Sequence, residues 1–301
     1  MRADVNTYRT RAGAEAPVEL AYDIFGASGR PLVAIMGIGA QRIFWDEPMC
    51  EALVAAGFQL VRFDARDVGE STRLDAETPR PGPLLARRLA NLAIAAPYTL
   101  SDMARDVVGL LDALGWRTAH VVGASLGGMV AQHLAIEHAS RVRSIASIMS
   151  SPGARRYLPE PHALRALFAP APATAAAAGE HIVELFAALG SPAWPADAAR
   201  LRRIGIAAFE RGVSPHGFLR QFAAVLASGD RRPELARTAV PTLVIHGSRD
   251  PMFPLAAGRA LAELVPDGTW LPIQGMGHDL PMPIWPVIVR ALAKHAARAE
   301  A

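Results

Sequence analysis

The sequence predicts an α/β protein built on one mixed, mostly parallel sheet of roughly eight strands flanked by helices. Short β-branched runs alternate with helical patterns between residues 31 and 149, which is the rhythm of parallel strands joined by helices. Two further runs near the N-terminus are placed to form an antiparallel pair at one edge. Residues 152–233 contain no β-like run and are rich in alanine, which indicates an all-helical insert.

The expected strands are short runs rich in β-branched residues. In chain order they are the edge pair 5–9 and 18–24, then 32–36, 59–63, 118–122, 142–149, 242–245 and a weaker run at 269–273.

The clearest helical pattern follows Thr99, where apolar residues recur every three or four positions from Met103 to Leu114. Thr99 and Asp102 form an acidic variant of the capping box, and Gly115 is placed to end the helix. Other helices are expected after residues 125 and 254, within the Arg- and Leu-rich segment 79–97, and at 162–168, 181–189, 217–226 and 284–295.

The composition is that of a soluble globular protein, with 301 residues of which 51% are hydrophobic and 20% charged. The composition and the helical insert together predict a core formed by residues 1–151 and 234–301. Residues 152–233 would then form a cap over that core. We expect the aromatic residues of the cap to contribute to a pocket, because ligand pockets are largely apolar.

The charge pattern and the apolar runs exclude several classes of partner. The net charge of +3 comes almost wholly from arginine, since Lys294 is the only lysine, and no basic block occurs, so nucleic acid is not expected. No apolar run approaches the roughly 18 residues of a membrane span. Cys50 is the only cysteine, and the N-terminus has no apolar stretch of signal-peptide type. We therefore expect a cytoplasmic protein, either a monomer or a homodimer, with no membrane partner.

Ser125 is the candidate nucleophile. Residues 123–127 match Gly-x-Ser-x-Gly between an expected strand and an expected helix. A tight turn there strains the backbone of its central residue, and small residues two positions to either side avoid a clash. The hydroxyl is then presented clear of the sheet. The short pattern also occurs by chance, so its placement between strand and helix is the stronger evidence.

A serine hydroxyl needs a base to take its proton, and His278 fits that role best. It ends the segment 274–278, whose glycines follow the last expected strand and let an imidazole reach the carboxyl edge of the sheet. The other histidines lie in helices, in the insert or within a strand. His246, which ends the strand before Asp250, remains the alternative base.

Asp250 is the candidate acid that orients the base. It lies just past the 242–245 run, at the edge of a parallel sheet where catalytic groups gather. It could instead cap the helix that begins near Pro254. Asp279 is the rival acid, but a sequence neighbour of His278 would struggle to reach the outer nitrogen of that imidazole. Asp250 is therefore preferred.

Two backbone amides are candidates for an oxyanion hole, the pair of donors that acyl transfer requires. One is the amide of Leu126, directly after the nucleophile. The other is expected from residues 36–40, where glycines allow close approach of the backbone. Ile38 is the first choice and Gly37 the alternative. A plain glycine turn is the other interpretation of this loop.

The order Ser125, Asp250 and His278, the serine turn and the glycine loop resemble the α/β-hydrolase superfamily over nearly the whole chain. The segment 62–71 resembles the family's loop after the fourth strand, whose role there is structural, so Asp64 and Arg66 are not expected to be catalytic. More narrowly, residues 36–39 with Trp45, the run 63–67 and the segment 275–281 resemble a bacterial esterase group that includes aclacinomycin methylesterase. Met36 is a departure, because many relatives carry histidine before the first glycine.

The resemblance implies a serine hydrolase that cleaves a small-molecule carboxylic ester with no metal or cofactor. Haloalkane dehalogenases and epoxide hydrolases of this fold use aspartate where Ser125 stands, so these activities are not expected. Carbon-carbon bond hydrolases, cofactor-free haloperoxidases (perhydrolases), acyltransferases, hydroxynitrile lyases and non-catalytic receptors stay open. We expect the substrate to contact four residues in particular: Gly37, Trp45, Phe186 and Phe222.

Overall fold

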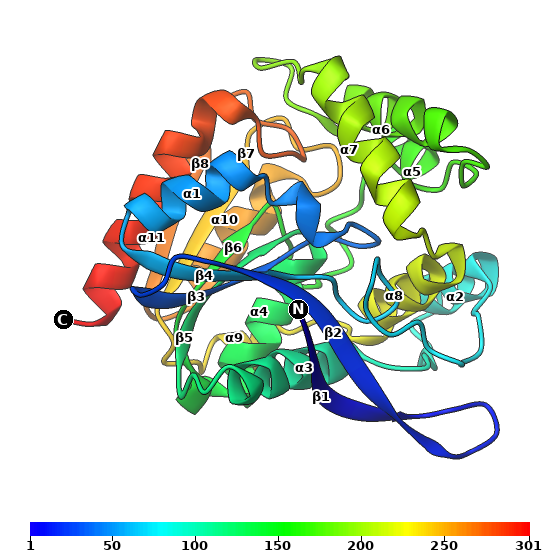
Figure 1. The fold of residues 1–301 in the computed structure, drawn as a ribbon, viewed down its shortest axis with the longest axis horizontal. Coiled ribbons are helices and arrows are strands. Elements are labelled where there is room, and N and C mark those ends of the chain that lie inside the picture. The colour runs from blue at the N-terminus through cyan, green and yellow to red at the C-terminus, as the bar shows by residue number, and fades with distance from the viewer.

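The computed structural model describes residues 1–301, and an eight-stranded sheet forms its centre (Figure 1). The strands are β1 (Arg2–Arg9), β2 (Glu15–Phe25), β3 (Arg30–Ile35), β4 (Phe58–Phe63), β5 (Ala119–Ala124), β6 (Val142–Ile148), β7 (Thr242–Gly247) and β8 (Gly268–Ile273). Their order across the sheet is β1-β2-β4-β3-β5-β6-β7-β8. The strands β1 and β2 pair antiparallel, β2 also pairs antiparallel with β4, and every other pairing is parallel. The predicted fold class is confirmed.

Helices cover both faces of the sheet. One face packs against α1 (Glu47–Ala55) and α11 (Trp285–Ala299), and the other against α3 (Leu100–Ala113), α4 (Leu126–Glu137) and α10 (Leu255–Leu264). Side chains of β3 alternate between these two cores, Leu32 on the α1 face and Val33 on the α3 face. Both are buried, which explains why the parallel strands are mainly apolar.

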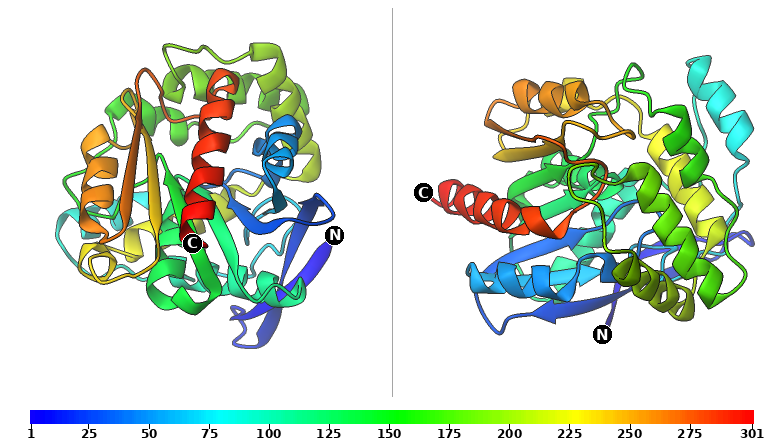
Figure 2. Two further views of the ribbon diagram at one scale, coloured as in Figure 1. Left: turned by 90° about the vertical axis from the view of Figure 1, so that its left-hand side faces the viewer. Right: turned by 90° about the horizontal axis from the view of Figure 1, so that it is seen from above.

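The first four of the five helices between β6 and β7, here called the cap helices, lie together at one end of the molecule, away from the C-terminus (Figures 1 and 2). They are α5 (Pro161–Leu167), α6 (Ala175–Leu189), α7 (Ala198–Arg211) and α8 (Pro215–Ala227). The expected helix at 181–189 begins earlier, and α7, like α1, was not among the helices expected. A Cβ built on Gly205 of α7 would lie 2.6 Å from the Ala178 carbonyl oxygen, so glycine lets α6 and α7 cross closely.

The short elements complete the chain. The helix α2 (Pro81–Leu89) lies in the segment where a short helix was expected, and it packs on α8. The helix α9 (Arg232–Leu235) follows the cap helices, and 3-10 turns occupy Arg42–Phe44, Ala139–Arg141 and Met282–Ile284. No helix combines the length and the apolar character that crossing a membrane would require.

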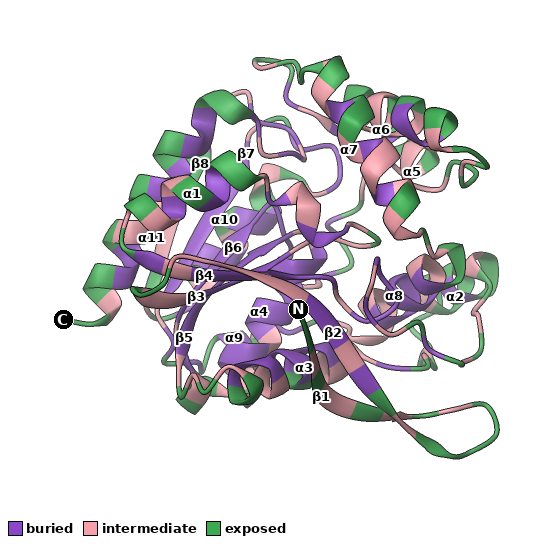
Figure 3. Cartoon of the chain, viewed as in Figure 1, coloured by how far each residue is buried: buried purple, intermediate pink, exposed green.

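Buried ion pairs attach the cap helices to the core. Arg220 of α8 donates hydrogen bonds of 2.8 and 2.6 Å to the Asp67 carboxylate, and both side chains are almost fully buried. Arg211 of α7 lies 2.8 Å from the buried carboxylate of Asp64. Asp64 and Asp67 belong to the loop after β4, so that loop has the structural contacts expected of it. Figure 3 shows the contrast between the buried central strands and the exposed outer turns of the cap helices and α2.

Candidate active site

Ser125 lies in a strained turn between β5 and α4. Its φ of 54° and ψ of −115° fall in a region that side-chain-bearing residues rarely adopt. A Cβ built on Gly123 would lie 2.1 Å from the Gly127 carbonyl oxygen, and one built on Gly127 would lie 2.3 Å from the Ile35 carbonyl oxygen. Only glycine fits at either position, because in both cases the obstacle is backbone. The sequence pattern around Ser125 is therefore a packing requirement of the turn.

The structure brings the three expected catalytic side chains together. His278, on the loop after β8, places Nε2 3.0 Å from Ser125 Oγ, although 153 residues separate the two in sequence. Its Nδ1 lies 2.9 and 3.0 Å from the two carboxylate oxygens of Asp250. With the ring proton on Nδ1, the imidazole donates to Asp250 and Nε2 accepts from the Ser125 hydroxyl. This is the arrangement in which a histidine can withdraw the serine proton.

Asp250 is held by its own loop as well as by His278. Its carboxylate accepts hydrogen bonds of 2.8 and 2.9 Å from the backbone amides of Met252 and Phe253. Asp250 does not cap the helix near Pro254, as the sequence also allowed, because the N-cap of α10 is Pro254 itself; its carboxylate instead holds the turn before that helix while it contacts the imidazole. The fixed carboxylate leaves His278 one favourable orientation, with Nε2 toward Ser125.

The two alternative residues have other partners. Nε2 of His246 lies 3.0 Å from the Phe253 carbonyl oxygen, and burial lowers the pKa of this imidazole. The Asp279 carboxylate accepts a hydrogen bond from the Ser191 hydroxyl, and burial raises its pKa. The side chains that meet Ser125 in a continuous chain of hydrogen bonds are those of His278 and Asp250.

The glycine loop after β3 lies directly against the nucleophile. A Cβ built on Gly37 would be 3.4 Å from Ser125 Cβ, so the backbone of this loop borders the site. The next amides are occupied, since Gly39 donates to the side chain of Gln221 at 2.8 Å and Ala40 donates to the Gly37 carbonyl at 3.2 Å. The amide of Ile38 makes no hydrogen bond within the protein. It is therefore free to donate to a ligand.

Leu126 supplies the second free donor. It is the first residue of α4, and the amides of a first helical turn have no partner within the helix. The helix dipole adds positive potential at this end. A negative oxygen bound beside Ser125 would be stabilised by both effects.

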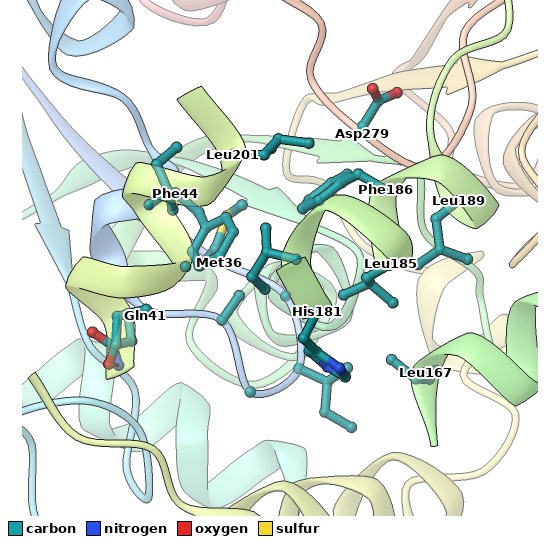
Figure 4. Close-up of a pocket in the computed structure, with 18 of the residues that line it drawn as sticks. Met36, Gln41, Phe44, Leu167, His181, Leu185, Phe186, Leu189, Leu201 and Asp279 are labelled. Atoms are coloured by element: carbon teal, nitrogen blue, oxygen red, sulfur yellow. Dashed lines mark hydrogen bonds between the residues drawn. The ribbon is translucent and has the colours of Figure 1, made fainter. Parts of the chain in front are cut away.

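A cavity of about 640 Å³ extends from Ser125 and His278 beneath the cap helices. Of its 46 lining residues 27 are hydrophobic, which favours a largely apolar ligand. Figure 4 shows His181, Leu185 and Phe186 of α6, with Leu201 of α7, around this space. Phe186 stacks on Phe44, with ring centroids 6.2 Å apart. Of the four residues expected to contact substrate, Gly37 and Phe186 line the cavity.

The expectation that Trp45 and Phe222 contact the substrate is wrong in this structure, because neither lines the cavity. Trp45 is fully buried in the core between the sheet and α1. Phe222 packs edge-on against Phe168, with ring centroids 4.9 Å apart, and against Leu84 of α2. Phe168 lines the cavity, so Phe222 supports the wall from behind.

Sequence reasoning missed several polar residues that border the site. Gln221 holds the glycine loop, and Ser191 contacts Asp279. Arg200 lines the cavity, forms an ion pair with Asp46, and has a pKa lowered chiefly by burial. None of these belongs to a motif, and all three lie within the alanine-rich insert, where only aromatic residues had been considered as candidates for pocket lining.

Residues 30–283 match the family described as the alpha/beta hydrolase fold. The chain belongs to this family. Rhodomycin D methylesterase from Streptomyces peucetius is 28% identical over 292 residues, an alignment that covers 89% of this chain and 91% of that protein. The pimeloyl-[acyl-carrier protein] methyl ester esterase from Chromobacterium violaceum is 34% identical over 202 residues and covers 67% of this chain and 79% of that protein.

Solved structures agree on the fold of this alpha/beta hydrolase. The enol-lactonase from Burkholderia xenovorans LB400 superposes with a TM-score of 0.69 at 21% identity, over 97% of this chain and 100% of that one. The expected resemblance to a methylesterase group within the family is confirmed. These relatives support the expectation that the chain is a carboxylic ester hydrolase.

Proposed function

We propose that this protein hydrolyses carboxylic esters through an acyl-enzyme formed on Ser125. The observation that carries the proposal is the continuous chain from Ser125 Oγ to His278 Nε2 at 3.0 Å and from His278 Nδ1 to Asp250 at 2.9 Å. A hydroxyl joined to an imidazole and a carboxylate in this way is an activated nucleophile. The methylesterase relatives support the choice of an ester as substrate.

The first half of the reaction forms the acyl-enzyme. Ser125 Oγ attacks the ester carbonyl carbon while His278 Nε2 accepts the hydroxyl proton. The carbonyl oxygen becomes an oxyanion that accepts hydrogen bonds from the amides of Leu126 and Ile38. His278 then gives its proton to the leaving alkoxide, the carbon-oxygen bond breaks, and the alcohol departs.

The second half regenerates the enzyme. A water molecule takes the place of the alcohol and loses a proton to His278 as it attacks the acyl carbon. The bond to Ser125 Oγ breaks, and His278 returns the proton to that oxygen, which releases the carboxylic acid. Throughout, Asp250 remains ionised and stabilises the imidazolium. No step needs an oxidant, a reductant or a second substrate other than water.

The cavity suggests how the ester is divided between its two halves. About 640 Å³ lined mainly by hydrophobic side chains would hold a large, mostly apolar acyl group beneath the cap helices. The two relatives reported above are named for methyl esters, whose alcohol is small. We therefore propose that the substrate is a small-alcohol ester of a bulky, largely apolar acid, with residues 152–233 acting as the cap over it.

The test is hydrolysis of p-nitrophenyl acetate, butyrate and octanoate, and of a methyl ester of a polycyclic aromatic acid, by the wild type and Ser125→Ala. We expect turnover by the wild type, with the bulkier esters preferred, and loss of turnover in the variant. Turnover that survives in Ser125→Ala would contradict the nucleophile. Absence of turnover with every ester would favour the carbon-carbon hydrolase, lyase or receptor alternatives.

A further inference from the structure

The carboxyl end of α6 lies directly on the loop that carries His278. The backbone amide of His278 donates a hydrogen bond of 2.7 Å to the Leu189 carbonyl. The amide of Gly277 donates to the Ser191 hydroxyl oxygen at 2.8 Å, and that hydroxyl donates in turn to the Asp279 carboxylate. Residues 189–191 of the cap region therefore hold three consecutive residues of the loop.

The two backbones meet with no space for a side chain between them. A Cβ built on Gly277 would lie 2.3 Å from the Gly190 carbonyl oxygen. Ser191 is 4% exposed and Asp279 is 6% exposed. Hydrogen bonds in such a water-poor contact are stronger than at the surface, and leaving one of the partners unpaired is costly.

We propose that Ser191 is a positioning residue for His278, holding the imidazole within reach of Ser125 through Gly277 and Asp279. This inference rests on the proposed function for the role of His278 as base. Ser191 itself does not touch Ser125 or line the cavity, so it acts only through the loop. Its hydroxyl accepts a hydrogen bond from the Gly277 amide and donates one to the Asp279 carboxylate, so it holds the residues on both sides of His278 in sequence.

The contact also ties substrate binding to the base. The helix α6 presents Leu185 and Phe186 to the cavity and ends at Leu189, whose carbonyl holds the His278 amide. A bulky acyl group that packs on α6 therefore presses on the same element that fixes the loop. Loss of the Ser191 hydroxyl should lower kcat and leave KM almost unchanged, because the cavity wall stays in place.

A shift in pH dependence distinguishes positioning from a merely structural role. The charged groups facing His278 are Asp250 from the loop after β7 and its own neighbour Asp279, with His246 behind Asp250 and Arg200 of α7 acting on Asp279. Burial raises the pKa of Asp279, and hydrogen bonds from Ser191 oppose that rise. Without Ser191 the carboxyl takes up a proton at higher pH, and the imidazolium loses a stabilising negative charge. The acid side of the kcat/KM profile should therefore move to lower pH.

The experiment compares Ser191→Ala with Thr174→Ala, a matched control at the other end of α6. Thr174 caps α6 by accepting from the Ala177 amide and is remote from the His278 loop. We measure kcat, KM and the pH profile on p-nitrophenyl butyrate, the rate at which diethyl p-nitrophenyl phosphate modifies Ser125, and Tm. For Ser191→Ala we expect kcat and the modification rate to fall about 10- to 100-fold, with KM within about twofold. Thr174→Ala should lower Tm and leave the rates unchanged.

Two further variants test the Ser191 hydrogen bond and the Asp279 charge separately. Ser191→Cys keeps a weak donor of similar size and should retain more activity than Ser191→Ala, and Asp279→Asn should move the acid limb in the same direction. Wild-type rates and an unmoved acid limb in a folded Ser191→Ala would overturn the proposal. The rate at which the phosphate reagent modifies Ser125 does not depend on ester turnover. If the protein proved not to hydrolyse esters, the modification rates of Ser191→Ala and wild type would therefore still test the positioning role.

Discussion

Gln221 of α8 accepts a hydrogen bond of 2.8 Å from the Gly39 amide, and its own amide donates to the Arg66 carbonyl at 3.0 Å. Gln221 is completely buried. It thus joins a cap helix to two core loops that line the cavity, those after β3 and β4. Because Gly39 is one residue beyond the proposed oxyanion donor Ile38, the cap helps to set where that donor points.

Gln221→Leu should weaken both activity and stability. It removes the part-buried hydrogen bond of the Gly39 amide and leaves the buried Arg66 carbonyl unpaired, which costs about 1–3 kcal/mol of the free energy of unfolding. We expect kcat/KM to fall by about tenfold or more as the Ile38 amide loses its fixed position. Gln59→Leu is the control, since Gln59 also donates to a backbone carbonyl, that of Gly26, and lies far from Ser125 in the sheet. Equal kcat/KM in the two variants would argue against a role for Gln221 in the oxyanion loop.

Ser125 should invert the usual order of alanine and glycine. At φ 54° and ψ −115° a Cβ is strained, whereas glycine adopts such conformations without that cost. The free energy of unfolding of Ser125→Gly should therefore be about 1 kcal/mol larger than that of Ser125→Ala, although both variants lack the nucleophile. Chemical denaturation of the two inactive variants measures the difference. A more stable alanine variant would show that the turn does not carry the strain inferred from its angles.

Gly123→Ala should be among the most damaging single substitutions in the chain. Its methyl group would lie 2.1 Å from the Gly127 carbonyl oxygen, so β5 or α4 must shift. We expect a loss of about 3 kcal/mol or more of the free energy of unfolding. Gly82→Ala is the matched control, because a Cβ there meets no atom within 4 Å and Gly82 lies within α2. The control should be neutral or slightly stabilising, by up to about 1 kcal/mol. Similar thermal midpoints for the two variants would contradict the packing described for the turn.

His295 should make the protein lose stability in acid. Burial lowers the pKa of this imidazole to about 4, from its ordinary value of 6.5. The unfolded chain binds the proton near pH 6.5 and the folded chain only near pH 4, so the stability contribution is full above 6.5 and is lost as the pH falls between these values. The loss approaches about 3 kcal/mol at the acid end. Urea unfolding at several pH values should show a weaker pH dependence for His295→Gln than for wild type. Identical dependence in the two proteins would rule out His295 as a source of acid lability.

The sequence located the catalytic candidates because their placement follows strand ends. Ser125, Asp250 and His278 each lie within a few residues of the end of a strand, and parallel strands end at one edge of the sheet. The strands themselves were predictable because burial on both faces makes them rich in apolar residues. The order of these residues in the chain and the glycine spacing around Ser125 supplied the rest of the prediction of the catalytic residues.

The cap region could not be predicted to the same depth. Trp45 and Phe222 were expected in the pocket, but the sequence does not show whether an aromatic side chain points into the cavity or away from it. Gln221 and Ser191 were missed because their partners are mainly backbone groups far away in sequence, which leave no pattern. The helix α7 is rich in arginine and alanine, and its apolar face emerges only when α6 packs against it.

Locating a covalent adduct tests most directly whether Ser125 is the nucleophile. The wild type and His278→Ala are treated with diethyl p-nitrophenyl phosphate, and peptides are sequenced by tandem mass spectrometry. We predict one diethylphosphoryl group on Ser125 in the wild type and a much slower reaction in His278→Ala, in which no base takes the serine proton. An adduct on another residue, or equal rates of modification in the two proteins, would contradict the claim that Ser125 is a nucleophile activated by His278.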